Sequence, residues 1–153
     1  MAVELDLPPA VGARDPARPL EIDAVFGSRI TAVDRSADGR HYRVTVALPR
    51  RLEPAERHEF CLHYRVPPGQ ALRDHYAIVP LSPVDDGRIR VRFPLDRLPV
   101  VVWRFAGIAP RQMDQATTAA GSDRIVADGA GEVRLAVCGL RQGLGYGLAW
   151  QPP

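Results

Sequence analysis

The chain has 153 residues, and its hydrophobic fraction of 46% and charged fraction of 25% are typical of a soluble globular protein. All 20 basic residues are arginine, a bias that a GC-rich genome explains better than selection for guanidinium chemistry. The formal net charge of +2 is too small to indicate nucleic-acid binding by itself, and the longest apolar stretch, residues 98–103, is too short to span a membrane.

The N-terminal segment, residues 1–19, carries four of the 15 prolines and little periodicity, which predicts an extended arm or linker. From residue 20 onward, apolar and polar side chains alternate in short segments, and this period of two is that of a strand with one buried face. In chain order, the predicted strands are 20–26, 28–34, 41–48, 58–66, 75–81, 88–93, 100–106, 124–127, 132–138 and 144–150.

Segments rich in glycine, proline and aspartate separate these strands, and residues 85–87 (Asp-Asp-Gly) predict one such turn. Residues 107–121 are predicted as a loop that holds a helical turn over 112–120. No segment keeps an apolar period of 3.6 residues over three turns. Eight to ten short strands predict an all-β fold, an antiparallel β-sandwich of the immunoglobulin-like, Greek-key or jelly-roll type. We expect one such domain over residues 20–153.

The clearest alternation is Arg-Ile-Arg-Val-Arg-Phe at residues 88–93. It predicts that Arg88, Arg90 and Arg92 stand in a row on the solvent side of a strand, with Arg104 on a neighbouring element. Such a basic row suits an acidic protein, a phosphate-bearing ligand or a DNA backbone. The alternative is an ordinary solvated face that nearby carboxylates neutralise; the candidates are Asp85, Asp86 and Asp96.

The apolar phases of two strands each contain a tryptophan, Trp103 and Trp150. Because large aromatic side chains anchor cores, we expect both rings to lie in one shared core.

Candidate chemical groups are few. Glu59, Cys61 and His63 alternate on one strand face with a spacing that a metal site can use, but no second cluster completes a coordination shell, so no metal is expected. No catalytic residue and no cofactor are assigned, because no nucleophile, phosphate-loop or dinucleotide motif is present. An alternative hypothesis is a pocket between the sheets, in an enzyme or a ligand-binding protein, that uses Cys61, His63 and His75.

Two cysteines, Cys61 and Cys138, do not make a disulfide framework, so free thiols in a reducing cytoplasm are expected. The N-terminus lacks the basic and apolar regions of a signal peptide, which also favours a cytoplasmic protein.

Several short words of the sequence resemble an uncharacterised C-terminal domain of bacterial helix-turn-helix regulators of the Cro/repressor-like type. The matching words are Glu59-Phe60, Arg65-Val66-Pro67, His75-Tyr76, Arg92-Phe93, Leu98-Pro99, Val102-Trp103-Arg104 and Gln142-Gly143-Leu-Gly-Tyr-Gly147. The resemblance covers roughly the last hundred residues, and it implies a sensory, dimerising or partner-docking module. No helix-turn-helix pattern precedes the β region here, so the resemblance transfers neither DNA binding nor a catalytic residue.

The sequence therefore predicts a non-enzymatic, regulatory β-sandwich that binds a protein partner or a small anionic ligand, with weak or no binding of nucleic acid and no membrane association. A polyanion-binding module that uses Arg88, Arg90 and Arg92 is an alternative. A homodimer formed through an exposed edge strand is a further hypothesis.

Overall fold

Contacts between residues divide the chain into an N-terminal unit, Met1–Leu72, and a C-terminal unit, Arg73–Pro153. The structure, a computed structural model, describes residues 2–6, 20–37, 41–53, 55–66, 73–81, 84–115 and 123–153. The expectation of one domain over residues 20–153 stays a prediction.

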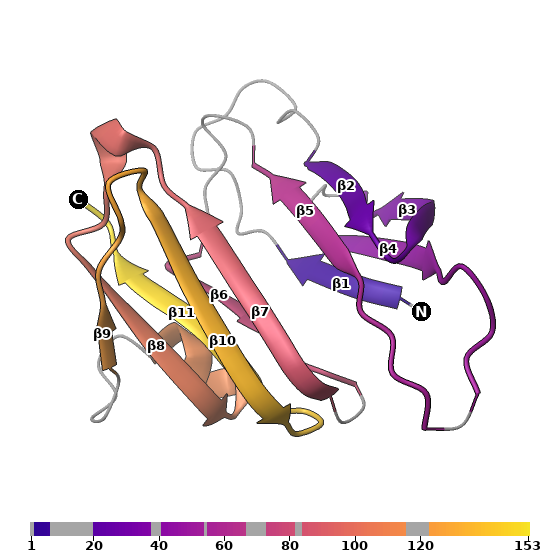
Figure 1. The fold of residues 1–153 in the computed structure, drawn as a ribbon. Coiled ribbons are helices and arrows are strands. Elements are labelled where there is room, and N and C mark those ends of the chain that lie inside the picture. The colour runs from indigo at the N-terminus through magenta and orange to yellow at the C-terminus, as the bar shows by residue number, and fades with distance from the viewer. Residues whose placement is uncertain are drawn as a thin grey trace. The chain divides into compact units, whose positions relative to one another are not determined.

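The N-terminal unit holds strands that form two antiparallel groups (Figure 1). These strands are β1 (Ala2–Asp6), β2 (Glu21–Phe26), β3 (Arg29–Arg35), β4 (His41–Ala47) and β5 (Cys61–Arg65). One sheet has the order β1-β4-β3, and β2 pairs with β5. Leu20 and Tyr42 are buried together between the two groups, with Ile22 and Tyr64 packed against them.

Strand β1 lies within residues 1–19, where the sequence predicted an extended arm. Its backbone pairs with β4, with Ala2 opposite Thr45 and Asp6 opposite His41. Val3 and Leu5 alternate with Glu4 and Asp6, but the prolines that follow them favoured an extended arm over a strand. The rest of the predicted arm, residues 7–19, lies outside the described residues.

The C-terminal unit holds two sheets that pack face to face (Figure 1). The first pairs β7 (Val84–Arg92) with β10 (Glu132–Leu140). The second has the order β6-β11-β8-β9 and contains β6 (His75–Ile78), β11 (Gly145–Gln151), β8 (Val101–Ile108) and β9 (Asp123–Ile125). Two short 3₁₀ segments, η1 (Leu95–Arg97) and η2 (Pro110–Gln115), flank β8 in the chain.

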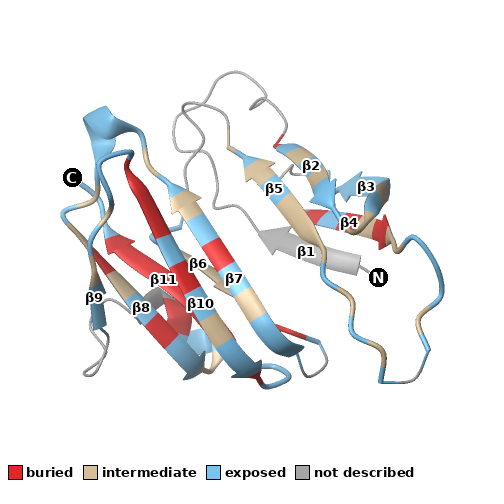
Figure 2. Cartoon of the chain, viewed as in Figure 1, coloured by how far each residue is buried: buried red, intermediate tan, exposed pale blue. Residues whose placement is uncertain are grey.

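The core of this sandwich comes from the inward phase of both sheets, and Figure 2 shows the buried bands along β7, β8, β10 and β11. Its buried members are Ile89, Val102, Val133, Leu135, Leu148 and Trp150. The ring of Phe93 meets Trp150 edge to face, with ring centroids 5.3 Å apart. Because Ile89 points inward, its neighbours Arg88 and Arg90 must point outward.

The expectation of one core that contains both tryptophans is wrong. In the register between β8 and β11, Trp103 lies opposite Ala149, whereas Trp150 lies opposite Val102. Directly opposed residues share a face of the sheet, so the two rings lie on opposite faces. Trp103 is half-buried, and Ala149 and Phe105 on its face form a second small core with Met113 of η2.

The predicted turn at residues 85–87 is also wrong, because those residues belong to β7. The ladder continues to Val84 opposite Leu140, with Gly87 opposite Val137. A Cβ atom at position 87 would come within 3.2 Å of the Val137 side chain, so glycine permits the close approach. Local turn chemistry is outweighed here by the pairing with β10.

The predicted fold class is confirmed, because the described residues form antiparallel strands β1 to β11 with a sandwich in the C-terminal unit. Within the described ranges, no helix has the length and apolar character that crossing a membrane requires.

Candidate functional site

The outward face of the β7–β10 sheet gathers arginines from both strands. Arg90 lies opposite Arg134, and Arg92 lies opposite Glu132. Directly opposed residues share a face of the sheet, so three guanidinium groups and one carboxylate share this surface. We call the set Arg90, Arg92, Glu132 and Arg134 the arginine face.

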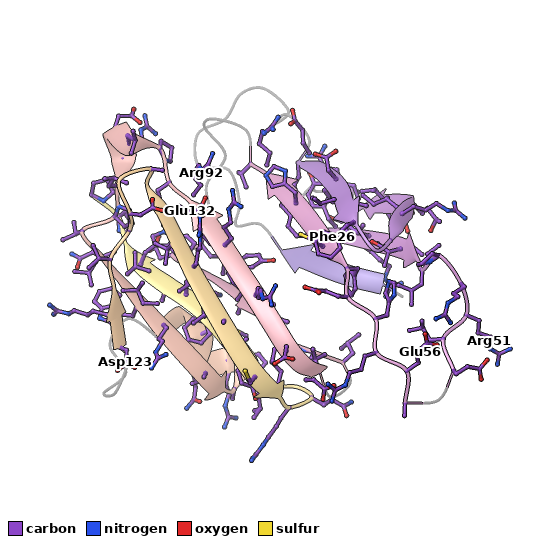
Figure 3. The ribbon with its side chains drawn as sticks, in the orientation of Figure 1. Phe26, Arg51, Glu56, Arg92, Asp123 and Glu132 are labelled. Carbon is purple, nitrogen blue, oxygen red and sulfur yellow. The ribbon has the colours of Figure 1, made fainter. Side chains whose placement is uncertain are left out.

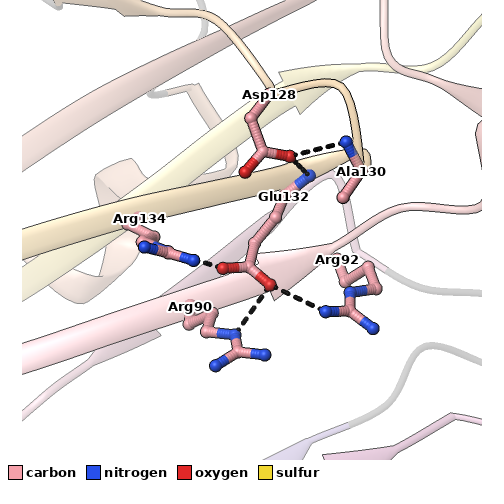
Figure 4. A network of polar contacts seen from close by, with 6 residues as sticks. All are labelled: Arg90, Arg92, Asp128, Ala130, Glu132 and Arg134. Carbon is pink, nitrogen blue, oxygen red and sulfur yellow. Dashed lines mark hydrogen bonds and ion pairs between the residues drawn. The ribbon is translucent and has the colours of Figure 1, made fainter.

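The carboxylate of Glu132 contacts all three guanidinium groups (Figure 4). Nε of Arg134 donates to Oε1 at 2.5 Å, and Nη2 of Arg92 donates to Oε2 at 3.0 Å. Nε of Arg90 lies 2.8 Å from the same Oε2. One carboxylate therefore holds the arginines of two neighbouring strands together.

Burial differs sharply between the partners in this network. The side chain of Glu132 is 2% exposed, whereas those of Arg90 and Arg92 are 63% exposed and that of Arg134 is 73% exposed. The hydrogen bond from Arg134 lowers the pKa of Glu132, with a further contribution from Arg92, while loss of hydration acts in the opposite direction. The same hydrogen bond raises the pKa of Arg134. Glu132 is therefore ionised at neutral pH.

The turn before β10 fixes the position of Glu132. Oδ1 of Asp128 accepts hydrogen bonds from the backbone N–H groups of Ala130 and Glu132, both at 2.9 Å. The Gly131 carbonyl accepts a hydrogen bond from Phe93 N–H, also at 2.9 Å. Gly131 has a φ of 73°, and a Cβ atom there would lie 2.5 Å from the Phe93 carbonyl oxygen, so only glycine suits this turn. These backbone hydrogen bonds therefore fix the position from which the Glu132 side chain reaches the three arginines.

The structure brings together some of the predicted arginines and separates others. Arg88 lies next along the same side of β7, opposite Ala136, and it has an interaction partner of its own. Arg104 lies on β8 in the other sheet, where its Nε donates to Oδ2 of Asp123 at 2.8 Å. Figure 3 shows Asp123 well separated from Arg92 and Glu132.

Glu132 and Arg134 were not predicted from the sequence as residues of the site. The sequence predicted Asp85, Asp86 and Asp96 as the neutralising carboxylates, because they are close to Arg90 and Arg92 in the chain. Glu132 is 40 residues from Arg92 in the chain, and only the pairing of β7 with β10 brings them together. The alternation of Glu132 and Arg134 with Val133 and Leu135 was the available signal.

The candidate metal and catalytic residues are distributed over both units of the chain. In the part of the chain that the structure describes, no group of three or more His, Cys, Asp or Glu side chains is placed to hold a metal ion. His63 lies 3.9 Å from Asp23, and the thiol of Cys61 contacts the carbonyl of Leu62. Cys61 and His63 belong to β5 in the N-terminal unit, whereas His75 belongs to β6 in the C-terminal unit.

Both cysteines are unpaired, as predicted. Cys138 is exposed on β10 opposite Asp86, and a hydrogen bond with that carboxylate raises the pKa of the thiol.

Comparison with known proteins adds no neighbour to this description: no family model, no curated protein and no solved structure matches the chain.

Proposed function

We propose that this chain is a non-enzymatic binding module that docks an acidic segment of a protein partner on the arginine face. The observation that carries the proposal is the placement of three exposed guanidinium groups around one buried carboxylate. Within the arginine face, three positive charges against one negative charge leave a surplus of two, and the neighbouring Asp128 interacts with Arg134 from outside this set. Exposed guanidinium groups with surplus charge suit carboxylate or phosphate groups of a partner.

An acidic protein suits this face better than a nucleic acid does. Three phosphate contacts would give a slope of about −3 for log affinity against log salt, which means weak binding at physiological salt. The formal net charge of +2 adds little long-range attraction. We therefore expect duplex DNA to bind more weakly than micromolar at about 0.15 M salt.

A regulatory role is part of the proposal. The resemblance to the C-terminal domains of bacterial helix-turn-helix regulators supports it, because a module of that kind would dock a partner instead of catalysing a reaction. A cytoplasmic location is proposed on the same basis, together with the two unpaired thiols.

Fluorescence anisotropy with a labelled peptide of alternating glutamate and glycine tests this function. We expect saturable binding that weakens with added salt, because the contacts are between charges. The double variant Arg90→Ala, Arg92→Ala should bind at least about tenfold more weakly, since hydrogen bonds to charged groups contribute about 1.5–3 kcal/mol each.

The matched control is Arg104→Ala, which removes an arginine that pairs with a carboxylate on the other sheet. This control should bind the peptide as the wild type does. Equal affinity of the wild type and the double variant would contradict the proposed function.

A further inference from the structure

Each arginine of the arginine face has N–H groups that do not contact Glu132. Arg90 and Arg134 contact Glu132 through Nε, so both of their terminal amino groups remain available. Arg92 uses only Nη2. Arg134 also interacts electrostatically with Asp128, the residue whose carboxylate fixes the turn before Glu132. N–H donors from three exposed side chains therefore remain around the Glu132 carboxylate.

The arrangement is compact enough for one ligand group. Each of the three arginines has a nitrogen within 3.0 Å of a Glu132 oxygen. Arg90 and Arg134 are direct cross-strand neighbours, and Arg92 is two residues from Arg90 on the same strand, which corresponds to about 6–7 Å. Long guanidinium side chains at such separations can reach the same anion.

The charge of the face selects the class of anion. The surplus of two positive charges on the arginine face matches a phosphate monoester, which carries about −1.5 to −2 at pH 7. A carboxylate or a phosphate diester carries a single negative charge and would leave part of the surplus unbalanced. A monoester also offers three terminal oxygens as acceptors, one for each arginine.

We infer that the acidic group recognised by the arginine face is a phosphate monoester on a segment of a partner protein, and that Glu132 is the positioning residue that orients the three guanidinium groups. This inference rests on the proposed function and names the ligand class of the same site.

Exposed apolar side chains at the turn before Glu132 favour a protein as the carrier of the phosphate. Leu95 is 64% exposed and Leu98 is 38% exposed. Both lie against Gly131, the residue before Glu132, because a Cβ atom there would be within 3.3 Å of each side chain. A peptide can place an apolar side chain on these leucines while its phosphate meets the arginines. A membrane surface, by contrast, is recognised by larger clusters of basic residues.

The test is an NMR titration of the full chain that follows the arginine Nε–H signals. The probes are N-acetyl-phosphoserine-N-methylamide, its glutamate counterpart and dimethyl phosphate, which is a diester. We expect the phosphoserine probe to bind at least about tenfold more tightly than either of the others, because only it carries a double charge. Equal affinities for the phosphoserine and glutamate probes would overturn the inference and leave the proposed function standing. If neither the probes nor the glutamate peptide bound, the proposed function would fail as well.

Two variants test the positioning role of Glu132. Glu132→Gln raises the surplus charge from two to three, so a site that works by charge alone would bind phosphoserine more tightly. We expect binding about tenfold weaker instead, because the arginines lose the carboxylate that orients them. Tighter or unchanged binding would overturn the positioning role. Asp123→Asn is the matched control, since it frees an arginine on the other sheet, and it should leave the affinity unchanged.

A second variant keeps the test decisive if Glu132→Gln does not fold. Arg134→Ala leaves Glu132 paired with Arg90 and Arg92, and it should weaken phosphoserine binding by about tenfold. Unchanged binding in this variant would overturn the three-arginine site. Vesicles that contain phosphatidylinositol 4-phosphate form the last arm, and tighter binding to them than to a phosphoserine peptide would overturn the protein partner.

Discussion

At the scale of single residues, Glu132 explains how the arginine face holds together. Arg90 and Arg134 are directly opposed like charges, which destabilise a strand pair. The Glu132 carboxylate contacts both arginines. Among the residues whose burial is described, Glu132 is the buried charged residue. A buried carboxylate is tolerated when donors replace its hydration, and three guanidinium groups supply them here.

The lowered pKa of Glu132 predicts an effect of acid on stability. A carboxyl group whose pKa is depressed by folding stabilises the protein fully above its ordinary pKa of 4.5, and this contribution is lost as the pH falls through the folded-state value. Glu132→Gln should therefore be less stable than the wild type at pH 7, and the difference should shrink below pH about 4. Thermal unfolding across this pH range checks it, with Asp123→Asn as the control. A difference that does not change with pH would contradict the account of the network.

At the scale of elements, Gly147 of β11 has the least room for a side chain among the described glycines of the C-terminal unit. A Cβ atom at this position would lie 2.0 Å from the carbonyl oxygen of Tyr76 on β6. Gly147→Ala should push β6 away from β11 and destabilise the sandwich by more than about 2 kcal/mol. Gly129→Ala is the matched control, because nothing lies within 4 Å of the added atom. Urea unfolding distinguishes the two, and similar losses in both variants would contradict the predicted register of β6 and β11.

The two tryptophans give a second prediction about the elements. Trp150 belongs to the core between the sheets, so Trp150→Ala should cost about 3–5 kcal/mol of unfolding free energy. Trp103 is half-buried on the opposite face of its sheet, and Trp103→Ala should cost less than about half as much. Denaturant unfolding of both variants checks the order. A larger loss for Trp103 would show that the two faces are assigned the wrong way round.

The sequence predicted most strands because alternation is a local signal. Residues 41–48 and 132–138, for example, differ from β4 and β10 by no more than two residues at either end. What it could not predict depends on register. The face of Trp103 is set by its pairing with Ala149, and the place of Gly87 in a strand is set by Val137. The pairing of Glu132 with Arg90 and Arg92 also depends on strand register. The sequence therefore predicted the arginines of β7 but not Glu132 or Arg134.

At the scale of the whole molecule, the local distribution of charge says more about binding than the net charge does. The formal net charge is only +2, yet the arginine face alone carries a surplus of two. Arg104, by contrast, is matched by Asp123. Local surplus without a large total charge favours short-range recognition of one acidic group over long-range attraction to a polyanion.

The most direct test of this account is a map of backbone amide shifts on the full chain during titration with the glutamate–glycine peptide. We predict that the shifts concentrate on residues 88–92 of β7 and 132–136 of β10, and that they disappear in the Arg90→Ala, Arg92→Ala variant. Shifts concentrated in the N-terminal unit, or shifts on β7 and β10 that persist in the double variant, would contradict the assignment of the arginine face as the binding site.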